Sequence, residues 1–201
     1  KIPVTKLDLI LLINLYGRTN DFEIIDENNK LYQVLKSIKQ NIIYDLSKLD
    51  TSEVTNMDQL FEHSMFNGDI SNWDVSNVTS MDLMFYDANI FNSNISNWNT
   101  SNVTSMEGMF SNTKEFNQSI GSWDVSKVTS MNSMFQYTKS FDKPLNWDLS
   151  NIIDMSYMFY EAKKFNSKIN FTNTNKVEII SSMFQGASSF NQELNLNFPN
   201  I

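Results

Sequence analysis

The chain has 201 residues, of which 41% are hydrophobic and 13% aromatic, which is enough for one domain with a sizeable core. It contains no Cys and a single His, so disulfides, thiolate metal sites, cysteine catalysis and most zinc sites are excluded. Fifteen basic against 23 acidic side chains give a net charge of −8, the wrong sign for a general nucleic-acid or anionic-membrane binder.

Residues 1–45 are predicted to form a helical N-terminal cap. Thr5 and Asp8 have the spacing of a capping box, and the apolar positions from there to Tyr16 indicate a first helix. Apolar residues in the range 31–42 recur at helical spacing and indicate a second helix. The longest apolar run near the start, residues 9–13, is too short to cross a bilayer, so no transmembrane segment is expected.

Residues 46–201 are predicted to form six repeats of 24 or 25 residues. The segment VTSMDLMF at residues 78–85 recurs along the chain, and its final Phe falls at positions 61, 85, 110, 135, 159 and 184. All four Trp share a second register, and ten of the eleven Met lie at two repeat positions. No single unit can bury these side chains alone, so stacking of the repeats into a continuous core with a parallel sheet is expected.

Two periodicities alternate within each unit. Met81, Met84, Phe85 and Ala88 are spaced as one face of a short helix, and the preceding Thr79 resembles the start of a capping box. Residues 145–149 and 194–198 alternate apolar and polar side chains, which is typical of a strand. The predicted fold class is therefore α/β, with a strand, a turn and a short helical segment in each unit.

The rows of Met and Phe are interpreted as core, since they recur in every unit whatever their neighbours are. A polar residue directly follows the second Phe of each unit, and we interpret this row as a ladder that satisfies backbone groups of the turns. Its members are Asn67, Asn92, Asn117, Asp142, Asn166 and Asn191.

The repeated phrase at residues 73–95, WDVSNVTSMxxMFxxAxxFNxxI, resembles the 25-residue unit of BspA-like leucine-rich-repeat surface proteins. The resemblance extends over residues 46–198. It implies a right-handed leucine-rich-repeat-like solenoid, with a parallel sheet on one face and short helical segments on the other. It also implies a secreted or surface-attached bacterial protein that adheres to host molecules or neighbouring cells. The pattern of that family defines scaffold positions and no catalytic ones.

The exposed strand face is the predicted partner-binding site. A polar residue follows each strand aromatic and a Ser comes two positions later, so stacking would set them in ladders about 4.8 Å apart. Leucine-rich-repeat modules often bind through this face, but the same side chains could instead cap turns. The candidate residues are Asp74, Ser76, Asn99, Ser101, Asp124, Ser126, Asp148 and Ser150.

The excess negative charge lies in the first half of the repeats. Residues 49–113 carry nine acidic side chains and no Lys or Arg, whereas residues 114–201 carry eight of each sign. The acidic half is either a solvated face or a docking surface for a cationic partner or calcium. The chain has no calcium-loop motif to support the calcium interpretation.

These observations favour a non-catalytic interaction module at the cell surface or secreted, which acts as a monomer. The expected partner is a protein or glycan on a host or neighbouring cell, and no nucleic acid, cofactor or metal is expected. His63 is expected to be a surface residue and not a general base. The alternative function is a structural spacer or stalk that displays another domain. Since no second cap follows residues 194–198, we expect the natural chain to continue.

Overall fold

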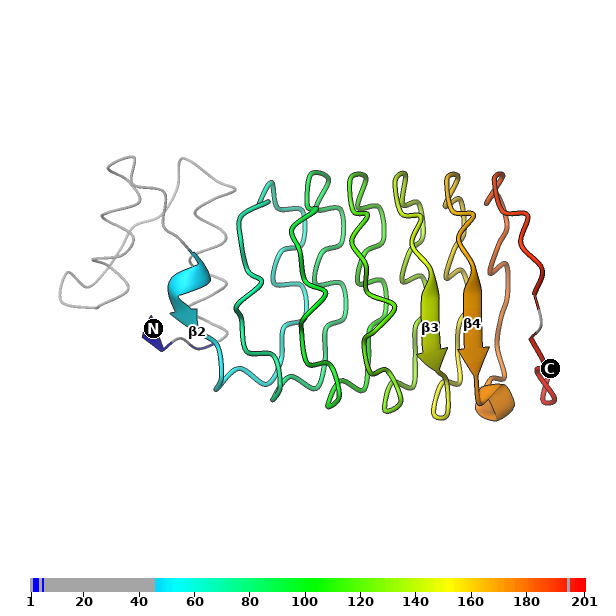
Figure 1. Ribbon diagram of the computed structural model, residues 1–201, viewed down its shortest axis with the longest axis horizontal. Helices are drawn as coiled ribbons and strands as arrows, with labels where there is room; N and C mark the ends of the chain where they lie inside the picture. Colours follow the sequence, from blue (N-terminus) through cyan, green and yellow to red (C-terminus); the bar gives the residue numbers. More distant parts are fainter. Residues whose placement is uncertain (1, 4, 6–45, 195) are drawn as a thin grey trace.

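The computed structural model describes residues 2–3, 5, 46–194 and 196–201, which form a stack of coils along one axis (Figure 1). Strand β1 (Ile2–Pro3) pairs in parallel with β2 (Leu49–Asp50), and the 3-10 helix η1 (Leu46–Lys48) precedes β2. Strand β3 (Leu145–Asp148) pairs in parallel with β4 (Ile169–Thr172), and the 3-10 helix η2 (Thr174–Lys176) follows. The described architecture combines two small parallel sheets with a few helical turns.

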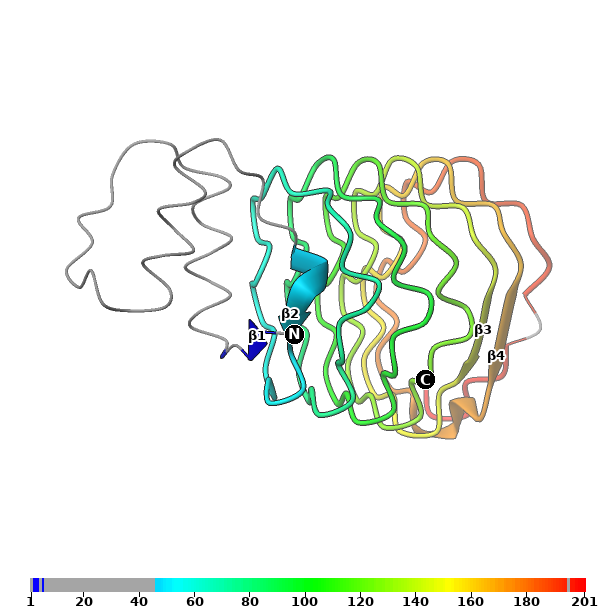
Figure 2. The ribbon, with the colours of Figure 1, turned by 60° about the vertical axis from the view of Figure 1, so that its left-hand side comes forward.

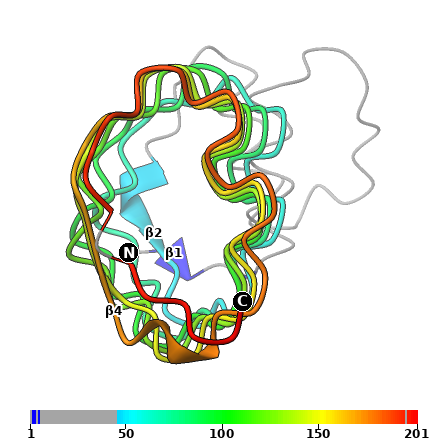
Figure 3. The same cartoon turned by 90° about the vertical axis from the view of Figure 1, so that its right-hand side faces the viewer.

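The helical cap predicted for residues 1–45 lies outside the described residues, apart from Ile2, Pro3 and Thr5. From residue 46 onward, the described chain winds through six successive coils that lie side by side (Figures 1 and 2). Viewed along the axis, the coils superimpose as one ring (Figure 3). We number the coils one to six by their first residues, which are Leu46, Ile70, Ile95, Ile120, Leu145 and Ile169.

Parallel backbone bridges join the same repeat position of all six coils. Each bridging residue lies 24 or 25 positions after the previous one, so the ladder follows the period of the sequence. The predicted parallel pairing between repeats is therefore confirmed. The bridged residues are Asn56, Ser80, Ser105, Ser130, Asp154 and Ile179.

One side of the stack, which we call the turn face, is built from consecutive backbone turns. It comprises residues 57–64, 81–88, 106–113, 131–138, 155–162 and 180–187. On this face alternate N–H groups bond to the next coil: Leu83 donates to the carbonyl of Glu107 at 2.8 Å. Each intervening N–H group donates a hydrogen bond to the carbonyl three residues earlier in its own coil, as Met84 does to Met81 at 3.3 Å.

The short helix predicted for residues 81–88 is wrong. Leu83 and Asp87 have φ angles of 55° and 53°, in the left-handed region. A non-glycine residue there costs about 1–2 kcal/mol, and the bonds to the next coil offset this cost. A continuous α-helix would use its N–H groups internally and leave the adjacent coils unpaired. The left-handed positions of the turn face are Gln59, His63, Leu83, Asp87, Gly108, Asn112, Ser133, Tyr137, Tyr157, Glu161, Ser182 and Gly186.

The capping box predicted at the start of the same segment is also absent. The hydroxyl of Thr79 does not cap its own segment but donates to the carbonyl of Thr55 in the preceding coil, at 3.2 Å. Asp82 likewise accepts from residues of the following coil. Side chains that would cap a helix therefore join neighbouring coils.

The strand side of the ring, which carries the Trp row, is extended as a four-residue strand in coils five and six, where one residue fewer precedes the aromatic residue. In coil four, two residues separate Ile120 from Trp123, and Trp123 donates its N–H back to Ile120 at 3.1 Å to form a turn. In coil five, one residue separates Leu145 from Trp147, and the chain stays extended as β3. The strand predicted for residues 145–149 is thus confirmed, whereas the described residues among 194–198 form no strand.

The Met, Phe and Trp rows fill the interior of the ring, so their predicted core role is confirmed. Met109 and Phe110 are 0% exposed. The ring of Phe110 stacks on Phe116 with centroids 4.0 Å apart, and on Phe85 and Phe135 in the adjacent coils at 5.6 and 5.8 Å. Each Phe of this row in coils two to five is therefore held from both sides by its equivalents.

The predicted polar ladder after the second Phe is confirmed as well. The side-chain oxygen of Asn92 accepts the N–H of Asn117 at 2.9 Å, and that of Asn117 accepts the N–H of Asp142 at 2.9 Å. Asp142 substitutes for Asn without breaking the row, since its carboxylate accepts the N–H of Asn166 at 2.9 Å. The row satisfies one backbone donor in each of these coils.

Candidate functional site

The residues predicted to bind a partner lie at the corner where the strand side ends. Oδ1 of Asp124 accepts the N–H of Ser126 at 3.0 Å, and the equivalent bond from Ser101 to Asn99 measures 3.2 Å. The Asp74–Ser76 and Asp148–Ser150 pairs form the same bond at 2.9 Å. One side-chain oxygen in each pair thus stabilises a turn, as the alternative interpretation expected. Partner binding by these eight residues stays a prediction.

These hydrogen bonds shift the ionisation of two of the carboxylates. The hydroxyl and the N–H of Ser126 lower the pKa of Asp124 below its ordinary 3.8. The hydroxyl of Ser150 is the main cause that lowers the pKa of Asp148, with a further bond from Asn173. Both turns are consequently strongest when the carboxylates are ionised.

We expect the stability of the stack to decline with acid in a way that depends on Asp124 and Asp148. A carboxylate with a lowered folded pKa stabilises the fold above the unfolded pKa of 3.8 and loses that contribution as the pH falls through the folded pKa. Replacing both residues by Asn keeps an acceptor oxygen and removes the titration. Thermal unfolding below about pH 4 should therefore depend less on pH in the double variant. Identical pH profiles would contradict the assignment.

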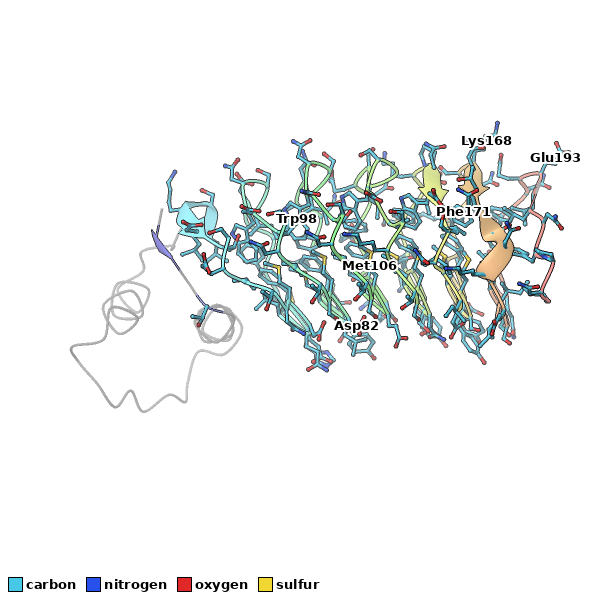
Figure 4. All side chains as sticks on the ribbon, turned by 90° about the horizontal axis from the view of Figure 1, so that it is seen from below. Asp82, Trp98, Met106, Lys168, Phe171 and Glu193 are labelled. Carbon is cyan, nitrogen blue, oxygen red and sulfur yellow. The ribbon has the colours of Figure 1, made fainter. Side chains whose placement is uncertain are left out.

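A second candidate site is a groove of about 620 Å³ on the turn face, mainly along coils two to four. A small side chain contributes to the hollow: Ser133 occupies the repeat position that Tyr157 fills in coil five. At the same position in coil three, the side chain of Leu83 lies over Gly108, 2.6 Å from where a Cβ would stand. Asp82, at its edge, lies on the opposite side of the stack from Trp98 (Figure 4). The lining residues are Asp58, Gln59, Asp82, Leu83, Tyr86, Glu107, Gly108, Ser111, Asn132, Ser133 and Gln136.

Three carboxylates line the groove, and no Lys or Arg does. Asp58 already accepts three hydrogen bonds: Oδ1 accepts from the hydroxyl of Ser80 at 2.5 Å and from the N–H of Asp82 at 2.9 Å, and Oδ2 accepts from Asn56 at 2.6 Å. Its role is therefore to tie coil one to coil two.

The other two carboxylates keep acceptor capacity. Oδ1 of Asp82 accepts from the hydroxyl of Ser105 at 2.5 Å and the N–H of Glu107 at 2.8 Å. Among the residues that the structure describes, no donor reaches Oδ2 of Asp82 or the exposed carboxylate of Glu107. These two groups on adjacent coils are available to a ligand.

Tyrosine side chains lie on the turn face in coil two and in coils four and five. Tyr86 lines the groove, and its ring meets His63 edge-on at 5.3 Å. In coils four and five, the exposed Tyr137 and Tyr157 both contact Tyr160, with centroids 5.4 and 5.7 Å away. The proximity of Tyr137 raises the pKa of Tyr160 above 10.0, so Tyr160 stays neutral and keeps its O–H donor at neutral pH.

His63 is a surface residue, as predicted, with 61% of its side chain exposed. Its Nδ1 lies 3.0 Å from Oδ2 of Asp87. This contact pairs coil one with coil two at the edge of the turn face.

The sequence analysis did not identify the groove. The sequence assigns Asp58, Asp82 and Glu107 to the acidic half and to the capping boxes of the predicted short helices, and neither assignment predicts a groove. A signal was present in the residues: Gly108 and Ser133 are small where neighbouring repeats carry Leu83 and Tyr157. Comparing the repeats position by position could have located the hollow.

In the part of the chain that the structure describes, no group of three or more His, Asp or Glu side chains is placed to hold a metal ion. The same residues include no helix with the length and apolarity that a membrane span requires.

The stacked coils, joined by parallel bridges at one repeat position, define a repeat protein. Two overlapping stretches, residues 29–146 and 117–198, match the family described as Mycoplasma protein of unknown function, DUF285. The chain belongs to this family. No curated protein and no solved structure matches it.

Proposed function

We propose that the chain is a non-catalytic interaction module, secreted or displayed on a bacterial cell surface, that binds a protein or glycan on a host or neighbouring cell. The observation that carries the proposal is the groove on the turn face, with the acceptor groups of Asp82 and Glu107 and tyrosines nearby. Stacked repeats provide long surfaces of this kind. Coils that keep one backbone can vary their exposed side chains, which suits recognition.

We further propose that the fold is a right-handed, leucine-rich-repeat-like solenoid of the kind found in BspA-like surface proteins. The parallel bridges at each repeat and the ring seen end-on in Figure 3 support it. In such a stack the turn face and the strand side are two separate surfaces. The strand-side residues from Asp74 to Ser150 therefore remain a second proposed contact region.

A structural spacer is the second candidate function. The described ends of the chain lie at opposite ends of the stack (Figure 1), and the stacked aromatic core runs through all six coils. Such a stack would hold another domain at a distance. A spacer predicts no saturable binding and tolerance of surface substitutions on both sides.

A binding screen of the 201-residue chain against extracellular-matrix proteins and an array of glycans tests the proposed function. We expect at least one saturable ligand. For any ligand found, two variants assign the surface: Glu107→Gln alters the groove, and the combined Asp124→Asn and Asp148→Asn change alters the strand side. A chain that binds nothing in the screen would contradict the interaction module and favour the spacer.

A further inference from the structure

We propose that the groove on the turn face binds an arginine-bearing segment of a partner polypeptide. The inference rests on the proposed function and names the chemistry of its partner. The arginine side chain would lie over Ser133, beside Leu83, with its guanidinium between the carboxylates of Asp82 and Glu107.

Charge is the first reason for a cationic ligand. Asp82 and Glu107 occupy equivalent positions on adjacent coils, and paired coils of this kind lie about 4.8 Å apart. The two side chains carry the same charge on adjacent coils, and no Lys or Arg lines the groove to offset it. A cation placed between them would be attracted by both.

Hydrogen-bonding capacity is the second reason. The hydroxyl of Ser133 donates to Oδ1 of Asn132 at 2.7 Å, and Nδ2 of Asn132 donates to Asp154 at 3.1 Å. These polar groups of the lining are therefore occupied, whereas Asp82 and Glu107 retain acceptors. A guanidinium offers five donors and no acceptor, and it can pair with carboxylates in a two-pronged geometry.

The shape of the groove and its aromatic wall favour arginine over lysine. Ser133 leaves space for a long side chain beside Leu83, and Tyr86 lines the same groove. A planar guanidinium stacks on a tyrosine ring while it pairs with a carboxylate, and it is less strongly hydrated than an ammonium group. The groove therefore offers an arginine both kinds of contact.

The test is a titration of the isotope-labelled 201-residue chain with a capped pentapeptide that contains two arginines and glycine elsewhere, followed by NMR. We expect saturable shifts of the Gly108 and Ser133 amide signals that weaken as salt is added. The same peptide with citrulline in place of arginine should bind at least about tenfold more weakly, because it keeps the shape and loses the charge.

Two matched pairs of variants locate the site. Ser133→Tyr should abolish the shifts by filling the groove; the repeat tolerates Tyr at this left-handed position, as Tyr157 in coil five shows. Ser182→Tyr makes the same change in coil six, outside the groove, and should leave binding intact. Glu107→Gln should weaken binding at least about tenfold, whereas Glu115→Gln, also exposed and outside the groove, should not.

Equal affinity for the arginine and citrulline peptides would overturn the proposal, as would equal binding by the Ser133→Tyr and Ser182→Tyr variants. An oligosaccharide that shifts the groove amides when the arginine peptide does not would also overturn it. A ligand from the surface screen that binds the Ser133→Tyr variant unchanged would refute the groove as the docking site and leave the proposed function standing.

Discussion

Replacing Phe110 by Ala is expected to destabilise the chain by about 3–5 kcal/mol. Phe110 is 0% exposed and stacks on Phe85, Phe116 and Phe135, so the truncation removes contacts within coil three and with both neighbouring coils. The cavity cannot close easily, since the backbone ladder holds the coils at a fixed spacing. Chemical denaturation followed by circular dichroism measures the loss of unfolding free energy.

Two aromatic controls accompany this substitution. Phe184→Ala removes the same repeat position in coil six, where the ring stacks only on Phe159 and Phe190 and is partly buried, so a smaller loss is expected. Tyr137→Ala truncates a side chain that is 45% exposed and should cost about 0.5 kcal/mol or less. A loss below about 0.5 kcal/mol for Phe110→Ala would refute the core assignment.

Replacing Gly121 by Ala is expected to cost about 1–3 kcal/mol, as overpacking does. A Cβ at position 121 would lie 2.4 Å from the carbonyl oxygen of Pro144 and 3.5 Å from Cα of Leu145. These are backbone atoms and cannot rotate away. The crowding arises because coil four carries an extra residue before its Trp and coil five does not, so a turn meets a straight strand at this junction.

Ser96→Ala is the matched control, because Ser96 holds the same position in coil three, where the next coil has the same length before its Trp. Its unfolding free energy should change by less than about 0.5 kcal/mol. Both variants are compared with the parent chain by thermal and chemical unfolding. Equal stability of the Gly121→Ala and Ser96→Ala variants would show that coil five can shift and that the close approach is not constraining.

Local pattern and backbone geometry diverge most clearly on the turn face. Met81, Met84, Phe85 and Ala88 have the spacing of a helix, and all four are buried as that spacing predicts. A chain of turns with left-handed residues every four positions brings the same side chains inward. The apolar pattern therefore predicts which residues are buried but does not distinguish these two backbones.

The two candidate sites also differ in how far the sequence predicts them. The sequence identified the strand-side ladder from Asp74 to Ser150 because its members recur in register, and the structure places them at equivalent corners. The groove depends on the large side chain that is missing at position 133 and on the placement of Leu83 over Gly108. Its acceptor capacity depends on which oxygens of Asp82 and Glu107 the neighbouring coils already use.

The period of 24 or 25 residues, the buried rows of Met, Phe and Trp, and the ladder from Asn67 to Asn191 were determined by the sequence itself. Each of these features follows from a residue type that recurs at one position of the repeat. Residues at that position have equivalent surroundings in successive coils. The tertiary structure alone decided the left-handed turns and the groove. These features depend on hydrogen bonds and contacts between residues about 25 positions apart, which no local pattern contains.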